Sequence, residues 1–419
     1  MATPKTLTEL SALIHEHTTK VEAYYTTHNL PAPSFHPSTP LKTVLPSDIE
    51  TSRQIVLEAM DELTALMLGP VECLIPPPNA WICVTALQRF GIAKSFPITE
   101  SSTFGEIAQK CSISESDTRR IVRQAIAFYI FTEPSPGVIA HTAASKALAQ
   151  LPAVGAFIDF IAGEMLPAST RLVDAMQKWP GSEEPNEAGF ALSEGTDFAM
   201  MEVVTRDPKR AQCIGTAMTF LHSRPEYDVK YLLDTFPWDN AARGVLVDVG
   251  GAKGDVAVDI CRALPDVKCV VLDKPEVISG AVVPDDVAGR IEFRGHDFFE
   301  KCDVRADVYL LRHVLHDWSD KYAAKILGNL VPSLRTGARI CVMDMCLPAP
   351  GSVSPFRGRV ARNSVLYMKG IQNAKERDEE DFRQLFESVD SRFRFDEVIK
   401  PEGSALALIC VTWMGENGV

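Results

Sequence analysis

Apolar residues recur every three or four positions in residues 6–28 and again in residues 47–68. This is the period of an amphipathic helix, so the pattern predicts two helices near the start of the chain. Residues 31–46 between them contain five prolines, which predicts an irregular connection. Short helical patterns with a strand-like segment follow in residues 78–150 and predict a winged-helix module. Further helical patterns continue to about Leu233.

The rhythm changes after Gly244, where short β-branched runs alternate with helical patterns. Such alternation predicts a parallel sheet with helices on both faces. The last two strand patterns follow one another without a helix, which predicts a hairpin at the sheet edge. We therefore expect an α/β protein with a mainly helical first domain in residues 1–235 and a Rossmann-like second domain in residues 236–419. The expected strands lie within residues 245–250, 267–273, 291–297, 306–312, 338–345, 393–400 and 405–413.

Composition narrows the class of protein. The 419 residues carry a formal net charge of −13, and an acidic chain has no general attraction for nucleic acid or anionic membranes. A winged helix can bind DNA, here through Arg119, Arg120 and Arg123, but the chain has no basic stripe. None of the ten cysteines forms a CxxC pair, no run of 18 apolar residues occurs, and the first ten residues contain no apolar leader. A cytoplasmic enzyme without a membrane span is the expectation.

Polar residues that suit a nucleoside ligand follow four successive strand patterns. The first strand leads into Gly250, Gly251 and Gly254, and glycines at a strand–helix turn let a ligand approach the backbone. Asp273 ends the second strand, 19 residues after Gly254, where a carboxylate can accept from both ribose hydroxyls. Dinucleotide-binding enzymes share this arrangement, although their GxGxxG fingerprint is absent, and a plain tight turn is a further alternative. Asp297 and Phe298 follow the third strand and Arg312 ends the fourth.

The segment LLRHVLHDWSDKYAAKIL, residues 310–327, resembles the LxxVLHDWxDxxxxxIL motif of plant and fungal O-methyltransferases of the caffeic acid type. The resemblance extends over nearly the whole chain. It includes the helical N-terminal part and the segments VDVGGxxG, GHDFF, MDMCLP and NAKERDEEDF.

This resemblance implies S-adenosylmethionine (SAM) as the cofactor, held by Gly250, Gly251, Gly254, Asp273, Asp297, Phe298 and Arg312. It implies that His316, as a neutral imidazole near pH 7, is the general base that deprotonates a phenol or enol. Asp344 and Glu376 would flank and orient this imidazole. No metal is needed, because SAM already carries an activated methyl group.

The resemblance also implies a homodimer built by the N-terminal helices and a small-molecule substrate. Middle-region side chains are candidates for the substrate pocket, although such residues at helical spacing are more often ordinary core. These candidates are Phe198, Met200, Met201, Met218, Phe220 and His222.

Two departures from the family pattern keep a second hypothesis open. Ala252 and Lys253 occupy positions where the family usually has a third glycine directly after Gly251, and Asn363 stands where the family often has an aspartate. Some fungal relatives no longer methylate and instead steer dehydrations or pericyclic ring closures of polyketide-derived molecules, with SAM bound but not consumed. Retention of His316, Asp344 and Glu376 favours methylation over this pericyclase alternative.

Overall fold

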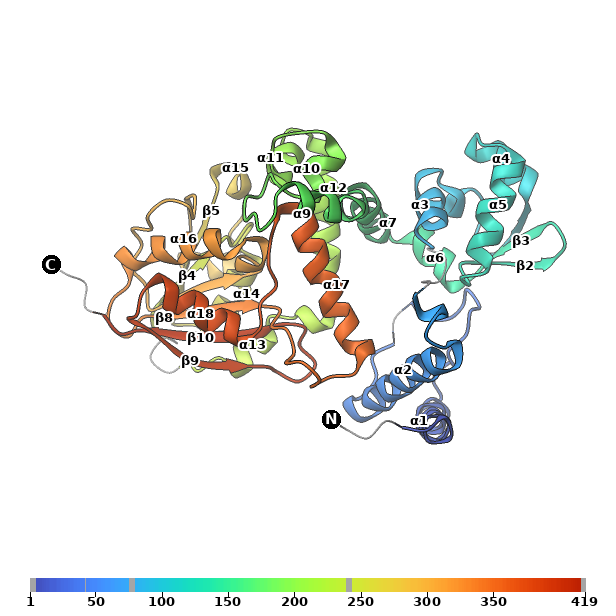
Figure 1. Cartoon of the computed structure of the whole chain (residues 1–419), viewed down its shortest axis with the longest axis horizontal. Helices are drawn as coiled ribbons and strands as arrows, with labels where there is room; N and C mark the ends of the chain where they lie inside the picture. Colours follow the sequence, from blue (N-terminus) through green and yellow to red (C-terminus); the bar gives the residue numbers. More distant parts are fainter. Residues whose placement is uncertain (1–4, 42, 75–79, 239–242, 416–419) are drawn as a thin grey trace. The chain divides into compact units, whose positions relative to one another are not determined.

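The computed structural model describes residues 5–41, 43–74, 80–238 and 243–415. The chain forms two compact units, each assembled from three segments. Unit 1 comprises residues 1–164, 208–220 and 350–360, and unit 2 comprises residues 165–207, 221–349 and 361–419. Figure 1 shows the elements of both units in chain order.

The first two helices of unit 1 match the predicted spans. Helix α1 covers Leu7–Thr27 and helix α2 covers Ser47–Leu68, and the two pack against each other. Helix α1 begins with a capping box, in which Thr6 Oγ1 accepts from the Glu9 backbone N–H and the Glu9 carboxylate accepts from the Thr6 N–H. The proline-rich connection contains neither helix nor strand among its described residues, as predicted.

A small three-stranded antiparallel sheet with helices around it follows, as expected of a winged-helix module. The strand order is β1-β3-β2, and the core contains Leu87, Ile107, Val122 and Phe131. Its elements are α3 (Trp81–Arg89), β1 (Ser101–Thr103), α4 (Phe104–Cys111), α5 (Glu115–Ile126), β2 (Phe131–Ser135), β3 (Val138–His141) and α6 (Ala143–Gln150).

The three arginines of this module that offered a DNA-binding alternative each pair with a carboxylate of the same module. Arg119 pairs with Glu115 and Arg123 with Glu133, while Arg120 lies 3.5 Å from Asp117. These pairings neutralise much of the local positive charge that a phosphate backbone would require.

A series of shorter helices connects the module to the large sheet. Unit 1 contains α7, and unit 2 contains α8 to α11 and α13, while α12 and α17 contribute to both units. The bounds are α7 (Pro152–Phe160), α8 (Leu166–Thr170), α9 (Leu172–Lys178), α10 (Gly189–Glu194), α11 (Met200–Thr205), α12 (Pro208–His222), α13 (Lys230–Thr235) and α17 (Pro355–Gln372).

Unit 2 is built on a seven-stranded sheet of order β6-β5-β4-β7-β8-β10-β9, counted over the described residues. The strands β4 to β8 pair in parallel, and β10 lies antiparallel between β8 and β9. The predicted edge hairpin is therefore confirmed. The strands are β4 (Val245–Val249), β5 (Lys268–Asp273), β6 (Ile291–Gly295), β7 (Val308–Arg312), β8 (Arg339–Asp344), β9 (Phe393–Ile399) and β10 (Ala407–Trp413).

Helices cover both faces of this sheet (Figure 1), which explains why its central strands are apolar on both sides. Ala257 and Ile260 of α14 pack in one core cluster, and Ile326 of α16 and Phe386 of α18 pack in the other. The structure confirms the predicted Rossmann-like α/β fold. The helices of this layer are α14 (Asp255–Ala263), α15 (Pro275–Ile278), α16 (Asp320–Leu330) and α18 (Glu379–Val389).

The domain boundary expected between residues 235 and 236 remains a prediction. Leu232 and Phe236, on either side of it, are both buried in the core of unit 2. Residues 239–242 of the expected linker, and residues 1–4 and 416–419 at the chain ends, lie outside the described residues.

Among the described residues, no single helix is long and apolar enough to cross a membrane. One strongly bent helix pair, Ala143–Gln150 with Pro152–Thr170, satisfies the length and composition criteria when taken together.

The turn after β4 requires left-handed backbone at three positions. Gly250 and Gly254 have φ values of +74° and +81°, and Ala252 has a φ value of +50°. A side chain at Gly251 is excluded for a different reason, since its Cβ would lie 2.5 Å from Asp248 Oδ2. The left-handed conformation costs a residue with a Cβ about 1–2 kcal/mol, so Ala252 is strained in this turn.

We predict that Ala252→Gly stabilises the protein by about 0.5–1 kcal/mol, because glycine adopts positive φ without a steric penalty. Ala324→Gly is the control: Ala324 lies inside α16, where glycine is expected to destabilise by about 1 kcal/mol. Thermal melts of the two variants should therefore shift in opposite directions. A lower melting temperature for Ala252→Gly would contradict the strain argument.

Candidate active site

The segment after β7 carries the central histidine. His313 follows β7 with a φ of +55°, a left-handed conformation that turns the chain sharply away from the sheet. A short 3-10 helix, Leu315–Asp317, then presents His316 before α16 begins at Asp320. Strand β7 lies between β4 and β8 in the middle of the sheet, so His316 sits at the carboxyl edge where open α/β sheets bind ligands.

Two buried carboxylates lie against His316, but they contact different parts of it. The Glu376 Oε1 atom is 3.3 Å from the imidazole Nδ1. The Asp344 Oδ2 atom accepts from the His316 backbone N–H at 3.2 Å. Asp317 Oδ1 lies 3.7 Å from the imidazole Nε2. Glu376 thus restrains the ring, whereas Asp344 restrains the main chain that carries it.

Ser364 and Arg377 position these groups, and sequence reasoning missed both. Ser364 on α17 donates its hydroxyl to Glu376 Oε1 at 2.7 Å. The Arg377 guanidinium is almost fully buried and donates to the carbonyls of Leu315 and Trp318 and to the carboxylate of Asp320. Arg377 therefore ties the loop of His316 to the segment that carries Glu376. In the sequence, only the position of Arg377 directly after Glu376 indicated that it lies near the site.

The charges around His316 control its protonation. Burial lowers its pKa, but Asp317, Glu376 and Asp344 outweigh burial and raise the pKa to about 10. Burial also raises the pKa of Asp344, to about 6. The expectation of a neutral imidazole near pH 7 is therefore wrong for the ligand-free chain, because three carboxylates gather around one cation.

A stack of aromatic rings adjoins this cluster. The rings of His222 and His313 stack with centroids 4.3 Å apart and an angle of 13° between their planes, and Tyr227 lies 5.7 Å from His313. Burial lowers the pKa of His222 to about 4 and the pKa of His313 well below its ordinary value, so both rings are neutral at pH 7. His313 was not singled out in the sequence.

The glycine turn and the expected acidic residues follow the strands β4, β5 and β6, which are neighbours in the sheet. Gly250 donates its N–H to Leu272 O at 2.7 Å. Asp273 accepts from the N–H groups of Ala252 and Lys274 at 2.9 and 2.7 Å. The Lys253 ammonium donates to the carbonyl of Ser279.

The remaining predicted ligand residues lie along the same edge. Asp297 Oδ1 accepts from the N–H of Phe299 at 2.9 Å. Phe298 lies across from the glycine turn, since a Cβ on Gly250 would come within 4.0 Å of its ring. Arg312 donates to the carbonyl of Tyr227 at 2.6 Å. The structure thus gathers the predicted residues at one edge, as parallel strands require.

Two buried polar atoms on the neighbouring strands β4 and β7 lack a hydrogen-bond partner among the described residues. They are Asp248 Oδ2 at the end of β4 and Arg312 Nε at the end of β7. Burial raises the pKa of Asp248 to about 7. Buried polar groups are normally satisfied, so two unsatisfied groups on neighbouring strands are typical of a site that takes a polar ligand.

The six candidates for the substrate pocket separate between the units. Met218 and Phe220 belong to unit 1, where Phe220 packs on Phe157. Of the four in unit 2, His222 joins the ring stack beside His316. Phe198 and Met201 are exposed and Met200 is buried. Asn363 precedes Ser364 on α17.

The chain matches known proteins over most of its length. Residues 183–390 match the family model described as an O-methyltransferase domain. O-methyltransferase kk1A of Curvularia clavata is 36% identical, with 97% of each chain covered. Chlorophenol O-methyltransferase of Trichoderma longibrachiatum is 33% identical, with 96% of this chain and 89% of that protein covered. The solved structure of OxaC in complex with SAH and oxaline is 19% identical, with a TM-score of 0.73, 96% of this chain covered and 100% of that chain.

The parallel sheet carries its predicted ligand residues at one edge, beside a histidine restrained by a buried glutamate. Relatives that match nearly the whole chain are more than 30% identical to it in sequence. The chain belongs to the SAM-dependent O-methyltransferases.

Proposed function

We propose that this chain methylates a hydroxyl of a small phenolic or enolic secondary metabolite, with His316 as the general base. The observation that carries the proposal is the contact of the His316 Nδ1 atom with buried Glu376, itself held by Ser364. A restrained Nδ1 leaves Nε2 as the atom that accepts the substrate proton. The relative named chlorophenol O-methyltransferase supports a phenol as the acceptor class.

The residues at the sheet edge fit the cofactor. SAM supplies a methyl group activated by a positively charged sulfonium. Arg312 Nε is buried without a partner and suits a carboxylate, and Asp273 and Asp297 keep lone pairs that suit ribose hydroxyls and an amine. Asp248 suits the cationic end of the ligand, because its buried Oδ2 atom has no hydrogen-bond partner among the described residues.

His316 has to lose a proton before it serves as a base. Its raised pKa means that the ligand-free enzyme holds an imidazolium at neutral pH. A bound cation disfavours a second positive charge nearby, so cofactor binding lowers the pKa of His316. We propose that Glu376 then stabilises the imidazolium that forms when the substrate hydroxyl is deprotonated.

A homodimer is part of the proposal. Helix α2 exposes Met60, Leu66, Met67 and Leu68, each with about half or more of its surface free. Contiguous apolar side chains on a helix mark a surface that another chain covers.

We predict that Asp248→Asn stabilises the ligand-free protein at pH 8 but not at pH 4. The folded pKa of about 7 exceeds the ordinary value of 3.8, so folding opposes ionisation of this group. Below pH 4, Asp248 does not lower the free energy of unfolding, because it is protonated in both states. As the pH rises from 4 to 7, its ionisation lowers the free energy of unfolding progressively. Above pH 7 the loss is constant, at up to about 4 kcal/mol. Thermal melts at both pH values test this.

Asp285→Asn, at an exposed aspartate of the same unit, is the control and should change neither melt. Calorimetry with SAM should show weaker binding to Asp248→Asn, since the carboxylate charge is lost. Equal melting temperatures of Asp248→Asn and the wild type at pH 8 would show that Asp248 carries no burial penalty and would remove this part of the cofactor assignment.

We predict that His316→Ala and His316→Gln lower turnover about 10²–10⁴-fold, because neither side chain accepts the proton. SAM affinity measured by calorimetry should change less than threefold. Turnover is followed by transfer of the labelled methyl group of SAM to a panel of phenols that includes a chlorophenol. His15→Gln, at an exposed histidine of α1, is the matched control and should retain full activity.

The same assay separates methylation from the pericyclase alternative. Undiminished label transfer by His316→Ala would eliminate the base assignment. No label transfer by the wild type to any hydroxylated acceptor, together with an isomerised product of unchanged mass, would support the alternative in which SAM is bound but not consumed.

We predict that the wild type sediments as a dimer at micromolar concentration and that Leu66→Glu combined with Met67→Glu produces a monomer. Burying a carboxylate in an apolar interface without a partner is unfavourable. Val282→Glu introduces the same charge at an exposed apolar residue of unit 2 and should leave the dimer intact. A monomeric wild type would refute the dimer.

A further inference from the structure

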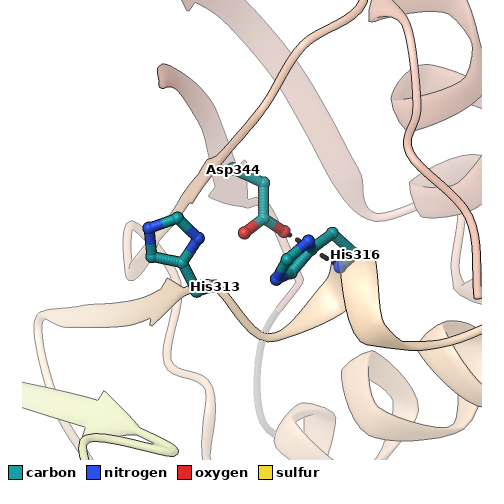
Figure 2. Close-up of side chains that lie close together, drawn as sticks. All are labelled: His313, His316 and Asp344. Atoms are coloured by element: carbon teal, nitrogen blue, oxygen red, sulfur yellow. Dashed lines mark hydrogen bonds between the residues drawn. The ribbon is translucent and has the colours of Figure 1, made fainter. Parts of the chain in front are cut away.

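His313, His316 and Asp344 bring three metal-ligating side chains together. One donor atom of each lies within 4.8 Å of the other two. Figure 2 shows the Asp344 carboxylate between the two imidazole rings. The buried atoms His313 Nε2 and Asp344 Oδ1 have no hydrogen-bond partner among the described residues. Since Asp344 is fully buried, its free oxygen is an unsatisfied acceptor that faces this cluster.

Each of the three side chains is restrained by a further contact: the two imidazoles by residues outside the cluster, and Asp344 by the backbone of His316. The His316 Nδ1 atom faces Glu376, an arrangement in which a carboxylate orients a histidine toward a metal. Asp344 Oδ2 accepts from the His316 N–H, which leaves Oδ1 for a ligand. The His313 ring is stacked on His222. The site is therefore held in place by contacts that do not use its donor atoms.

The donor set selects the class of ion. Two imidazoles and one carboxylate suit Zn²⁺ and similar transition metals, whereas Mg²⁺ and Ca²⁺ prefer oxygen ligands. Tetrahedral Zn²⁺ with bonds of about 2.0–2.1 Å needs ligand atoms about 3.3 Å apart. The three donor atoms lie within 4.8 Å of one another, so metal binding requires them to move closer by up to about 1.5 Å. Asp317 and Glu376 add negative charge nearby, which attracts a cation.

We propose that His313, His316 and Asp344 form a Zn²⁺-class metal site whose occupation inhibits methyl transfer. Binding of the metal follows from the three donors alone, whereas inhibition also rests on the function proposed above. A metal ion that binds Nε2 of His316 displaces the proton from this nitrogen into solvent. The metal-bound Nε2 then has no lone pair with which to accept a substrate proton. The metal is thus a competitor of the substrate proton.

The binding test uses full-length, tag-free, chelator-treated protein in a Cys73→Ser background, because the exposed Cys73 thiol can itself bind zinc. Co²⁺ is the probe, since a histidine-ligated tetrahedral site gives it visible absorption bands. We expect one Co²⁺ per chain, displaced by one equivalent of Zn²⁺. His313→Asn should weaken binding at least tenfold because a ligand is lost. Asparagine tolerates the positive φ at this position better than most residues.

Asp344→Asn is the second variant and should weaken binding to a similar degree, so a folding defect of one variant does not decide the result. His15→Asn, at the exposed histidine of α1, is the matched control and should bind like the parent. Absence of Co²⁺ bands in the parent, or equal binding by His313→Asn and the parent, would overturn the metal site.

The inhibition test measures label transfer with increasing Zn²⁺, each variant compared with its own zinc-free rate. The parent should be inhibited and should recover with chelator, and the half-inhibitory Zn²⁺ concentration should rise at least tenfold in His313→Asn. Zinc binding without inhibition would overturn the inhibitory role. Failure of the zinc-free parent to transfer label would refute the proposed function and leave the Co²⁺ result standing.

Discussion

A single buried guanidinium ties together the segments around His316 in unit 2. Arg377 donates to two carbonyls of the His316 loop and to Asp320 at the start of α16, and its own carbonyl accepts from Leu347 beyond β8. Residues 315–320 thus contact the Arg377 side chain, and Leu347, from a second distant segment, contacts its backbone carbonyl. Lysine cannot replace it, because one ammonium does not present donors in the planar fork that these acceptors require. Arg377 thereby ties the loop of His316 to the segment that carries Glu376.

That anchor makes possible an unusual concentration of negative charge. Asp344 and Glu376 are nearly inaccessible to water, and Asp317 lies close by. Such carboxylates are costly to bury unless a cation or hydrogen-bond donors face them. These carboxylates raise the pKa of His316, so His316 is the cation that faces them in the ligand-free chain. The same charge favours a cationic methyl donor and a divalent metal, so the proposed function and the proposed inhibition have one electrostatic origin.

The glycine turn has to pack closely on the sheet and also leave the acidic residues at the ligand edge in position. Gly251 has no side chain because Asp248 lies directly beneath it, and Asp248 itself is buried without a partner. Ala252 occupies a left-handed position that glycine would adopt without strain. The Ala252 N–H nevertheless donates to the Asp273 carboxylate, and the Lys253 ammonium donates to the Ser279 carbonyl. The departure from the usual glycine therefore leaves the acidic residues of the edge in place.

The sequence by itself determined the elements and their order. Helices α1 and α2 follow from a hydrophobic period of 3.6, and the parallel strands follow from short β-branched runs that alternate with helical patterns. Both patterns depend only on near neighbours in the chain. The alignment of Gly250, Asp273, Asp297 and Arg312 also follows, because parallel strands bring their carboxyl ends to one edge. His316 was identified through its motif.

Only the tertiary structure decided what surrounds His316. Ser364 meets the site from α17, and its position in the sequence does not indicate that contact. His313 and Arg377 are near His316 and Glu376 in the sequence, but the side-chain contacts that they make depend on packing. The protonation of His316 was likewise misjudged from the sequence, since a pKa depends on charges through space and not on neighbours along the chain. Secondary structure is encoded locally, whereas hydrogen-bond partners, burial and charge come from packing between segments that the sequence keeps far apart.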